Sequence, residues 1–259
     1  MSDCLLAQVV GPVAELTLNR PVRRNALSAD LIARLTDALR ACDAATDVRV
    51  VLLTGTPPAF CAGLDLHDVL ATPPELRAFD TRPLLGLYET LATLAKPTIA
   101  VVNGAATAGG AALALTCDLV IAGRSARFGF PGIRQGLAPA IVVPFLLRAA
   151  GPCRAAYLLL TGALLPAEQA AAWGLVAEVV DDDRLAERAR EVSDLIAGHA
   201  ADAVRNMKAS LARFAPGAGG PGAAWRAECE HMPLSPAARE SLARLLGADE
   251  GGAVNPAAS

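Results

Sequence analysis

The sequence of 259 residues has few aromatic side chains and no excess of basic ones. Aromatic residues make up 4% of the chain and hydrophobic residues 53%, so a buried core must consist mainly of Ala, Val, Leu and Ile. The net charge is −3, from 23 Lys and Arg against 26 Asp and Glu, and no basic run alternates with aromatic residues. A nucleic-acid partner is therefore not expected.

Cysteine pairs and metal-ligand clusters are also missing. The cysteines are scattered without a Cys-x-x-Cys pair, and His199 and His231 stand apart from any ligand spacing, which predicts free thiols and no metal site. The N-terminal stretch has an acid at Asp3 and no basic region, unlike a secretory signal. We therefore expect a cytoplasmic protein whose thiols stay reduced. The cysteines are Cys4, Cys42, Cys61, Cys117, Cys153 and Cys229.

One long stretch, 97–117, carries no charge at all. Asn103, three glycines and several threonines interrupt it, which is not typical of a membrane span. The stretch predicts a buried strand followed by a buried helix, and we expect no membrane partner.

Strands and helices alternate through about residue 123. A hairpin is expected around Gly11–Pro12, and Ser28 is expected to cap a helix that buries Leu31 and Leu35. The run "VRVVLLTG" is typical of a central strand, and a Gly/Pro-rich loop is expected to follow it. Beyond Pro152 the pattern is mostly helical. The alternation predicts an α/β core built from crossover units.

Two glycine-bearing turns share one layout, in which a strand ends, glycine appears and a helix begins. They are "FCAGLDL" at 60–66 and "TAGGAAL" at 107–113. Glycine permits close approach of the backbone to a ligand, and the first amides of a helix have no partner within it. Two such N–H donors would form an oxyanion hole, worth roughly 3 to 4 kcal/mol per donor. The alternative interpretation is that the glycines only allow helix and strand to pack closely.

Five segments occur in the order and spacing of a known family: "NRPVRRNALS", "FCAGLDL", "KPTIAVVNGAATAGGAALALTCDLVIA", "RFGFPGIRQGLAP" and "AAWGLVAEVV". On these the sequence resembles the crotonase (enoyl-CoA hydratase/isomerase) superfamily, from near the start to about Arg190. The resemblance implies a spiral of ββα units with a C-terminal helical region. It also implies an acyl-CoA thioester as ligand, coenzyme A as part of the substrate with no other cofactor, and a role in fatty acid metabolism.

The same resemblance implies the assembly and the domain organisation. Family members form homotrimers or dimers of trimers whose C-terminal helices help to close the site. An acyl-CoA-binding core is then expected in residues 1–195, and a helical trimerisation region with a disordered tail in 196–259.

The resemblance assigns roles to particular residues. The backbone N–H groups of Leu64 and Gly109 are the predicted oxyanion hole and thus the predicted catalytic groups. Lys208 is expected near the phosphates of coenzyme A, which Arg23 or Arg24 would also contact. The predicted contacts with coenzyme A and the acyl group are Arg24, Ala26, Leu27, Ala62, Asp65, Leu66, Gly110 and Gly132.

The usual acid and base are absent. Classical hydratases of the family have two glutamates at the positions of Ala112 and Gly132, and dienoyl-CoA isomerases have an acid at the position of Ala140. Hydration needs a base and an acid, each contributing about 100- to 10,000-fold. Since none of these residues transfers a proton, classical hydration is not expected.

Each residue that could replace the missing glutamates has two interpretations. His67, Asp68, Glu89 and the cluster 228–232 either supply proton transfer or are solvated surface residues, and Gln135 lies with Arg134 in the bend after Gly132. Arg134 either binds a second carboxylate or pairs on the surface, and Cys61 is either a nucleophile or a small packed side chain. Dihydroxynaphthoyl-CoA synthases, which use bicarbonate, also have glycine at 132, but the other positions of that branch do not match: Phe130, Pro131, Leu137 and Pro139.

Two functions therefore remain open from the sequence. One is an enzyme of the enoyl-CoA hydratase/isomerase group with unusual proton-handling residues. The other is a noncatalytic acyl-CoA carrier or sensor.

Overall fold

The computed structural model describes residues 3–71, 73, 78–138, 140–214, 231–233 and 236–250. The chain opens with an antiparallel hairpin of β1 (Leu5–Val10) and β2 (Val13–Leu18), which turns at Gly11 with φ +58°. Helix α1 (Ala29–Ala44) follows, and the Ser28 hydroxyl accepts a hydrogen bond from the Leu31 N–H at 3.3 Å. The predicted hairpin and helix cap are both confirmed.

A six-stranded sheet forms the centre, in the order β1-β2-β3-β6-β8-β11. Its further strands are β3 (Val50–Gly55), β6 (Thr98–Val102), β8 (Leu119–Gly123) and β11 (Glu178–Val180). Every pair after the hairpin is parallel. Every residue of β6 is buried, as expected for a strand that is covered on both faces.

A second sheet of four strands lies beside the first, in the order β10-β9-β7-β4. Its strands are β4 (Ala59–Cys61), β7 (Ala105–Thr107), β9 (Arg127–Gly129) and β10 (Leu164–Pro166). The chain passes from β3 to β4 to α2 (Leu66–Leu70), and from β6 to β7 to α4 (Gly109–Thr116). This succession is the predicted spiral of ββα units. The stretch after β3 is not purely a loop, since it contains β4.

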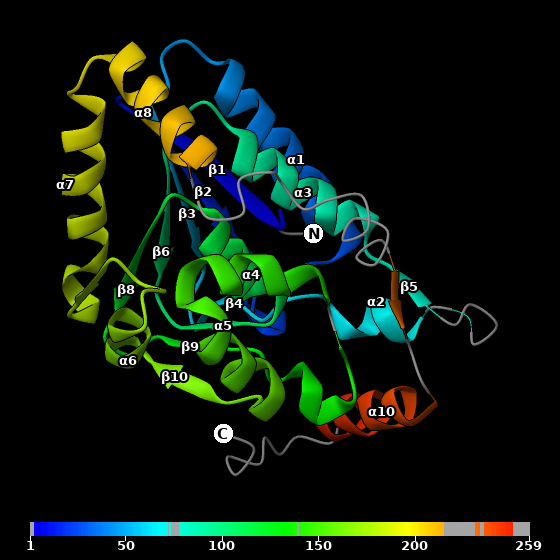
Figure 1. Ribbon diagram of the computed structural model, residues 1–259. Coiled ribbons are helices and arrows are strands. Elements are labelled where there is room, and N and C mark those ends of the chain that lie inside the picture. Colours follow the sequence, from blue (N-terminus) through cyan, green and yellow to red (C-terminus); the bar gives the residue numbers. More distant parts are fainter. Residues whose placement is uncertain are drawn as a thin grey trace.

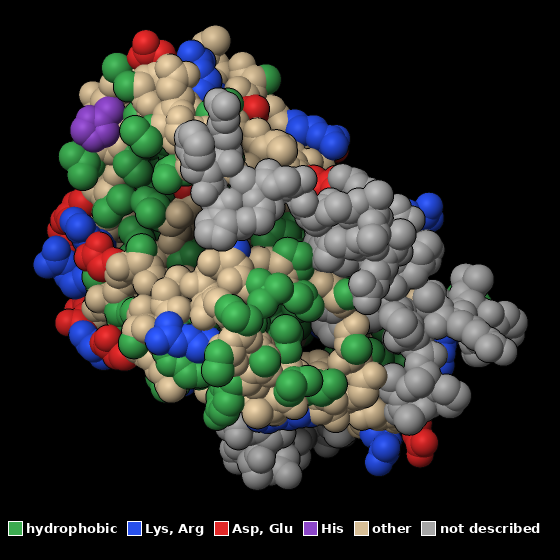
Figure 2. All heavy atoms as spheres, in the orientation of Figure 1, with side chains coloured by type: hydrophobic (Ala, Val, Ile, Leu, Met, Phe, Trp, Pro, Cys, Tyr) green, Lys and Arg blue, Asp and Glu red, His purple; other side chains and the backbone are tan. Residues whose placement is uncertain are grey.

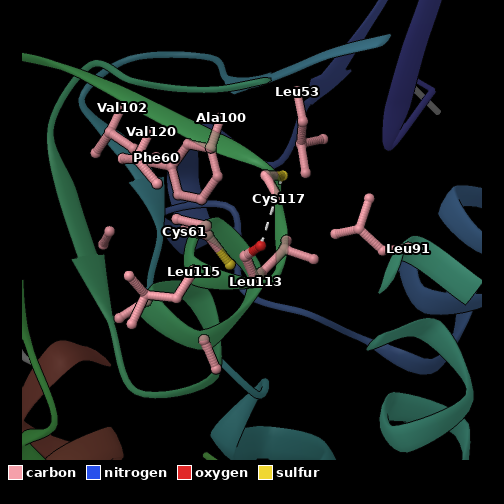
Figure 3. Packing of buried hydrophobic residues seen from close by; sticks show 14 of the residues in the cluster. Leu53, Phe60, Cys61, Leu91, Ala100, Val102, Leu113, Leu115, Cys117 and Val120 are labelled. Atoms are coloured by element: carbon pink, nitrogen blue, oxygen red, sulfur yellow. Dashed lines mark hydrogen bonds between the residues drawn. The ribbon is translucent and has the colours of Figure 1, made fainter. Parts of the chain in front are cut away.

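Helix α4 is buried along its whole length. In Figure 3 Leu113 and Leu115 lie with Phe60 and Cys61 of β4, and with Ala100, Val102 and Val120 of the main sheet. The predicted buried strand and helix within 97–117 are therefore confirmed. Small side chains and glycines let α4 approach both sheets closely.

Other helices cover the sheets. Helices α1 and α3 (Arg82–Thr93) run side by side, and α7 (Leu185–Ala197) packs against β3, β6 and β8 (Figure 1). Helix α6 (Ala167–Ala172) contacts β10 and β11. The predicted domain boundary after residue 195 falls within α7, near its C-terminal end.

Helix α5 (Val143–Thr161) is interrupted at Gly151, where φ is 73° and ψ is 172°. Within the described part of the chain, the segment Ala140–Thr161 is long enough and apolar enough to cross a membrane, judged by length and composition alone. The segment packs on α4 and on the 3-10 turn Pro131–Gln135, contacts that a core helix also makes.

The C-terminal part returns to the core. After α8 (Ala201–Phe214), strand β12 (His231–Pro233) pairs with β5 (Ala78–Asp80), and α10 (Pro236–Glu250) packs against α2 (Figure 1). Leu242 of α10 is fully buried in a cluster with Val69 and Leu137. The tail 251–259, predicted to be disordered, lies outside the described residues.

Candidate functional site

A pocket of about 260 Å³ lies where α10 closes over the turns after β4 and β7. Its walls are mainly aliphatic and come from α2, α3, the segment 131–142 and α10. The polar side chains among its described lining residues are Arg24, Thr107 and Gln135. An aliphatic pocket with a few polar groups is typical of a small-molecule site.

Leu64 lines the pocket and offers an unused backbone donor. The turn before it depends on Gly63, whose φ of +93° is unfavourable for other residues. The Leu27 N–H donates to the Gly63 carbonyl at 2.7 Å, and the Asp65 N–H donates to the Leu27 carbonyl at 3.1 Å. The Leu64 N–H lies between these two bonds and has no acceptor in the described part of the chain.

Gly109 supplies a second donor from the start of α4. Ala108 precedes it with φ 49° and ψ −121°, a conformation that is rare for a residue with a side chain. The Gly109 N–H, which is the first of the helix, likewise has no acceptor among the described residues.

The two donors are close neighbours. A methyl group built on Gly109 would lie 3.7 Å from the Leu64 nitrogen, and one built on Gly63 would lie 2.9 Å from the Gly109 nitrogen. The turns that carry the two N–H groups are thus in contact, as an oxyanion hole built from two backbone donors requires. For Leu64 the predicted reason was wrong, however. Helix α2 begins only at Leu66, and the Asp65 carboxylate caps it by accepting a hydrogen bond from the His67 N–H. The Leu64 N–H therefore belongs to the turn before the helix and is not one of the first amides of the helix.

Six of the ten predicted site residues line the pocket, namely Arg24, Ala62, Leu64, Leu66, Gly109 and Gly132. The other four are Ala26, Leu27, Asp65 and Gly110, and all are buried. Leu27 packs in the core cluster under α1, and the Asp65 carboxylate pairs with Arg20 at 2.8 Å. Arg20 was not recognised from the sequence, because its partner lies far along the chain.

Gly110 has a packing role. A methyl group on it would lie 2.1 Å from the Cys61 carbonyl oxygen, inside the van der Waals contact distance. Of the two interpretations of the glycine pair, close helix–strand packing thus applies to Gly110. Gly109 has the position of a ligand donor.

The candidate proton-transfer residues lie elsewhere. His67 Nε2 is hydrogen-bonded to Arg23, and an Asp68 carboxylate oxygen accepts from the Ala29 N–H at 3.3 Å. Glu89 and Arg134 do not line the pocket, whereas Gln135 does. Ala112 is fully buried within α4. Pro139 and residues 228–230 lie outside the described residues, as do the side chains of His231 and Met232.

Cys61 adjoins the two donors, but its thiol is buried. Burial raises the pKa of Cys61 to about 12, so the thiol stays protonated at neutral pH and is not an activated nucleophile. The interpretation as a small packed side chain therefore applies. Burial likewise raises the pKa of Tyr88 well above its ordinary value, and the Tyr88 hydroxyl donates to the Gly109 carbonyl at 2.7 Å. Tyr88 shares a helical spacing with Leu84 and Leu91, a pattern that a core residue also has, so the sequence carried no separate signal for this hydrogen bond.

Lys208 lies away from this pocket. Its ammonium group is 2.7 Å from the Asp118 carboxylate and lines a second pocket of about 790 Å³ between α5, β8 and α8. Metal-ligand clusters of three or more His, Cys, Asp or Glu are absent from the described residues.

Comparison with known proteins gives one consistent relationship. A family model described as enoyl-CoA hydratase/isomerase matches residues 9–227. The chain is 41% identical over 198 residues to the 1,2-epoxyphenylacetyl-CoA isomerase of Escherichia coli K12, covering 74% of this chain and 76% of that protein. It is 39% identical over 197 residues to the 2,3-dehydroadipyl-CoA hydratase of the same strain, covering 76% of each.

A solved structure agrees with these matches. The enoyl-CoA hydratase from Mycobacterium tuberculosis H37Rv has a TM-score of 0.76 and 39% identity, with 88% of this chain and 96% of that chain covered.

The packing role of Gly110 predicts a strong effect of an added methyl group. We expect Gly110→Ala to lower the free energy of unfolding by about 3 kcal/mol, because the backbone of β4 must move away. Gly86→Ala, on α3 with no atom within 4 Å of the new methyl, is the control and should stabilise by about 0.5–1 kcal/mol. Urea unfolding measures both, and equal stability of the two variants would contradict the assignment.

Proposed function

Because the chain belongs to the enoyl-CoA hydratase/isomerase family, we propose that it binds an acyl-CoA thioester and polarises the carbonyl through the Leu64 and Gly109 N–H groups. One observation carries the proposal: two neighbouring backbone donors, without acceptors among the described residues, lie at an aliphatic pocket. The carbonyl oxygen of a thioester gains negative charge when an enolate forms. Fixed donors at that oxygen stabilise the enolate more than the ground state.

The pocket sides fit different parts of such a ligand. Leu66, Leu137 and Ile141 give an apolar surface for an acyl chain, and Thr107 and Gln135 add hydrogen-bonding groups. Arg24 is an exposed cation at the pocket and fits a phosphate of coenzyme A. No cofactor beyond the coenzyme A of the ligand is part of the proposal.

The lack of an acid or base in the described pocket lining limits the reactions that the protein can catalyse. In the described lining of the pocket there is no Asp, Glu, His, Cys, Lys or Tyr side chain. Hydration and isomerisation of an enoyl thioester both move a proton, so polarisation of the carbonyl by two N–H donors completes neither reaction without a proton acceptor from outside this lining. The same observation favours a second candidate function, a noncatalytic acyl-CoA carrier or sensor.

Calorimetry and a substrate panel test the proposal. We expect crotonyl-CoA to bind saturably and more tightly than free coenzyme A, because only the thioester has an oxygen for the two donors. Turnover of any enoyl-, dienoyl-, 3-hydroxyacyl- or malonyl-type thioester supports the enzyme, and binding without turnover supports the carrier. Absence of any thioester binding would contradict both functions.

Gly132 offers a direct test of the missing carboxylate. Gly132 lines the pocket, and a Cβ atom built there meets Leu137 at 3.5 Å, an ordinary contact, so Gly132→Glu starts a carboxylate side chain beside the pocket without a clash at the Cβ. We expect hydration of crotonyl-CoA to rise by about 100-fold or more over the wild type, because one acid or base is restored. Gly132→Gln is the matched control. Equal rates for the two variants, or fast hydration by the wild type, would show that no carboxylate is missing.

Ala112→Glu is the less favourable way to restore a carboxylate. Ala112 is fully buried in α4 and does not line the pocket. Burial of an unpaired carboxylate destabilises the fold. The two positions are therefore best tested separately.

We also propose that the protein is a cytoplasmic homotrimer or dimer of trimers. The five cysteines of the described chain are free thiols, which suits a reducing compartment. Hydrophobic side chains gather over α5 in Figure 2. Met207 and Leu211 of α8 are 62% and 67% exposed beside the larger pocket, and a second copy of the chain would cover them.

A charge on this surface is expected to disrupt the assembly. The double variant Met207→Glu with Leu211→Glu should sediment as a monomer, because apolar area is replaced by charge. Val22→Glu, at a side chain that is 94% exposed elsewhere, should keep the wild-type mass. Analytical ultracentrifugation measures the masses and separates three from six subunits. If the double variant still sediments as an oligomer, the interface lies elsewhere on the protein.

A further inference from the structure

The Leu64 N–H lies in a turn with little regular structure of its own. Strand β4 before it has three residues and helix α2 after it has five. A donor of an oxyanion hole must be fixed to within about 0.5 Å to act on a transition state. The short elements next to Leu64 do not provide such a frame, so the orientation of the turn depends on contacts from elsewhere.

Those contacts come from the segment Arg24–Leu27. The Ala62 N–H donates to the Arg24 carbonyl at 3.0 Å, and Leu27 exchanges hydrogen bonds with Gly63 and Asp65 on either side of Leu64. The segment is itself irregular, with φ of 47° at Arg24 and 56° at Asn25. Its shape must therefore be held in turn.

Arg20 holds the segment and the turn together. Its guanidinium donates to the Ala26 carbonyl at 2.5 Å and to the Asp65 carboxylate at 2.8 Å. The other Asp65 oxygen accepts from the His67 N–H at 3.0 Å. The side chains of Arg20 and Asp65 are 22% and 5% exposed, so the ion pair is largely shielded from solvent. Two donors of one rigid guanidinium thus link the segment Arg24–Leu27 to the residue that follows Leu64.

We propose that Arg20 and Asp65 are positioning residues, which act on the bound thioester by orienting the Leu64 N–H. Neither side chain lines the pocket, so their effect on a ligand passes through the turn. The inference rests on the proposed function, since it concerns one donor of the same oxyanion hole. It gives the Asp65 carboxylate a structural partner, where the sequence predicted a contact with coenzyme A.

Infrared spectroscopy of a bound thioester tests the orientation directly. The probe is butyryl-CoA with ¹³C at the thioester carbonyl, whose stretching band moves to lower wavenumber as hydrogen bonds to its oxygen strengthen. We expect a shift on binding to the full-length wild type and about half that shift in Arg20→Gln, because one of two donors is misaligned. Arg20→Lys keeps the charge and should recover part of the loss.

The controls separate orientation from stability. Arg34→Gln breaks an exposed Arg–Asp pair, with Asp30 at 2.9 Å, and should keep the full shift. Affinity for free coenzyme A should stay within about twofold in all variants. If Arg20→Gln fails to fold, Asp65→Asn takes its place, since its amide oxygen still accepts from the His67 N–H while the charge is lost.

The outcomes distinguish the two proposals. Absence of any shift in the wild type with the thioester bound would overturn the oxyanion hole, and the positioning role with it. A full wild-type shift in folded Arg20→Gln or Asp65→Asn would overturn the positioning role alone. A reduced shift that Arg20→Lys partly restores, at unchanged affinity for coenzyme A, is the expected result.

Discussion

The close approach of α4 to β4 is the constraint on which the site depends. Gly110 lies against the Cys61 carbonyl, where any side chain would collide with the backbone. This contact brings the first amide of α4 beside the turn that follows β4, so that donors from two separate ββα units lie together. Neither unit has the pair alone. The proposed oxyanion hole is thus a property of the packing between units, and the small residues of α4 permit that packing.

The composition of the pocket has two opposite consequences. An aliphatic lining lowers the local dielectric constant, so a backbone N–H acts more strongly on a carbonyl oxygen than it would in water. The same lining leaves the described site without a carboxylate or imidazole to carry a proton. The features that favour carbonyl polarisation therefore disfavour hydration.

The features predicted from the sequence depend on local patterns or on several motifs in order. The hairpin at Gly11, the cap at Ser28 and the central strand after Val48 follow from neighbouring residues, and the structure has each of them. Strands of three residues, such as β4, are too short to show alternation, so the second sheet followed from the ββα units that the family resemblance implied and not from a local pattern. The role of Asp65 was missed for another reason, since its partner Arg20 belongs to a distant segment.

The backbone at Ala108 bears on the choice between an enzyme and a carrier. Its φ of 49° and ψ of −121° cost on the order of 1–3 kcal/mol for a residue with a side chain. Ala108 directly precedes the Gly109 N–H, and the Tyr88 hydroxyl donates a hydrogen bond to the Gly109 carbonyl. A carrier gains little from a strained donor, because a neutral thioester oxygen is a weak acceptor. An enolate oxygen gains much more, so the strain favours a protein that stabilises charge as it forms.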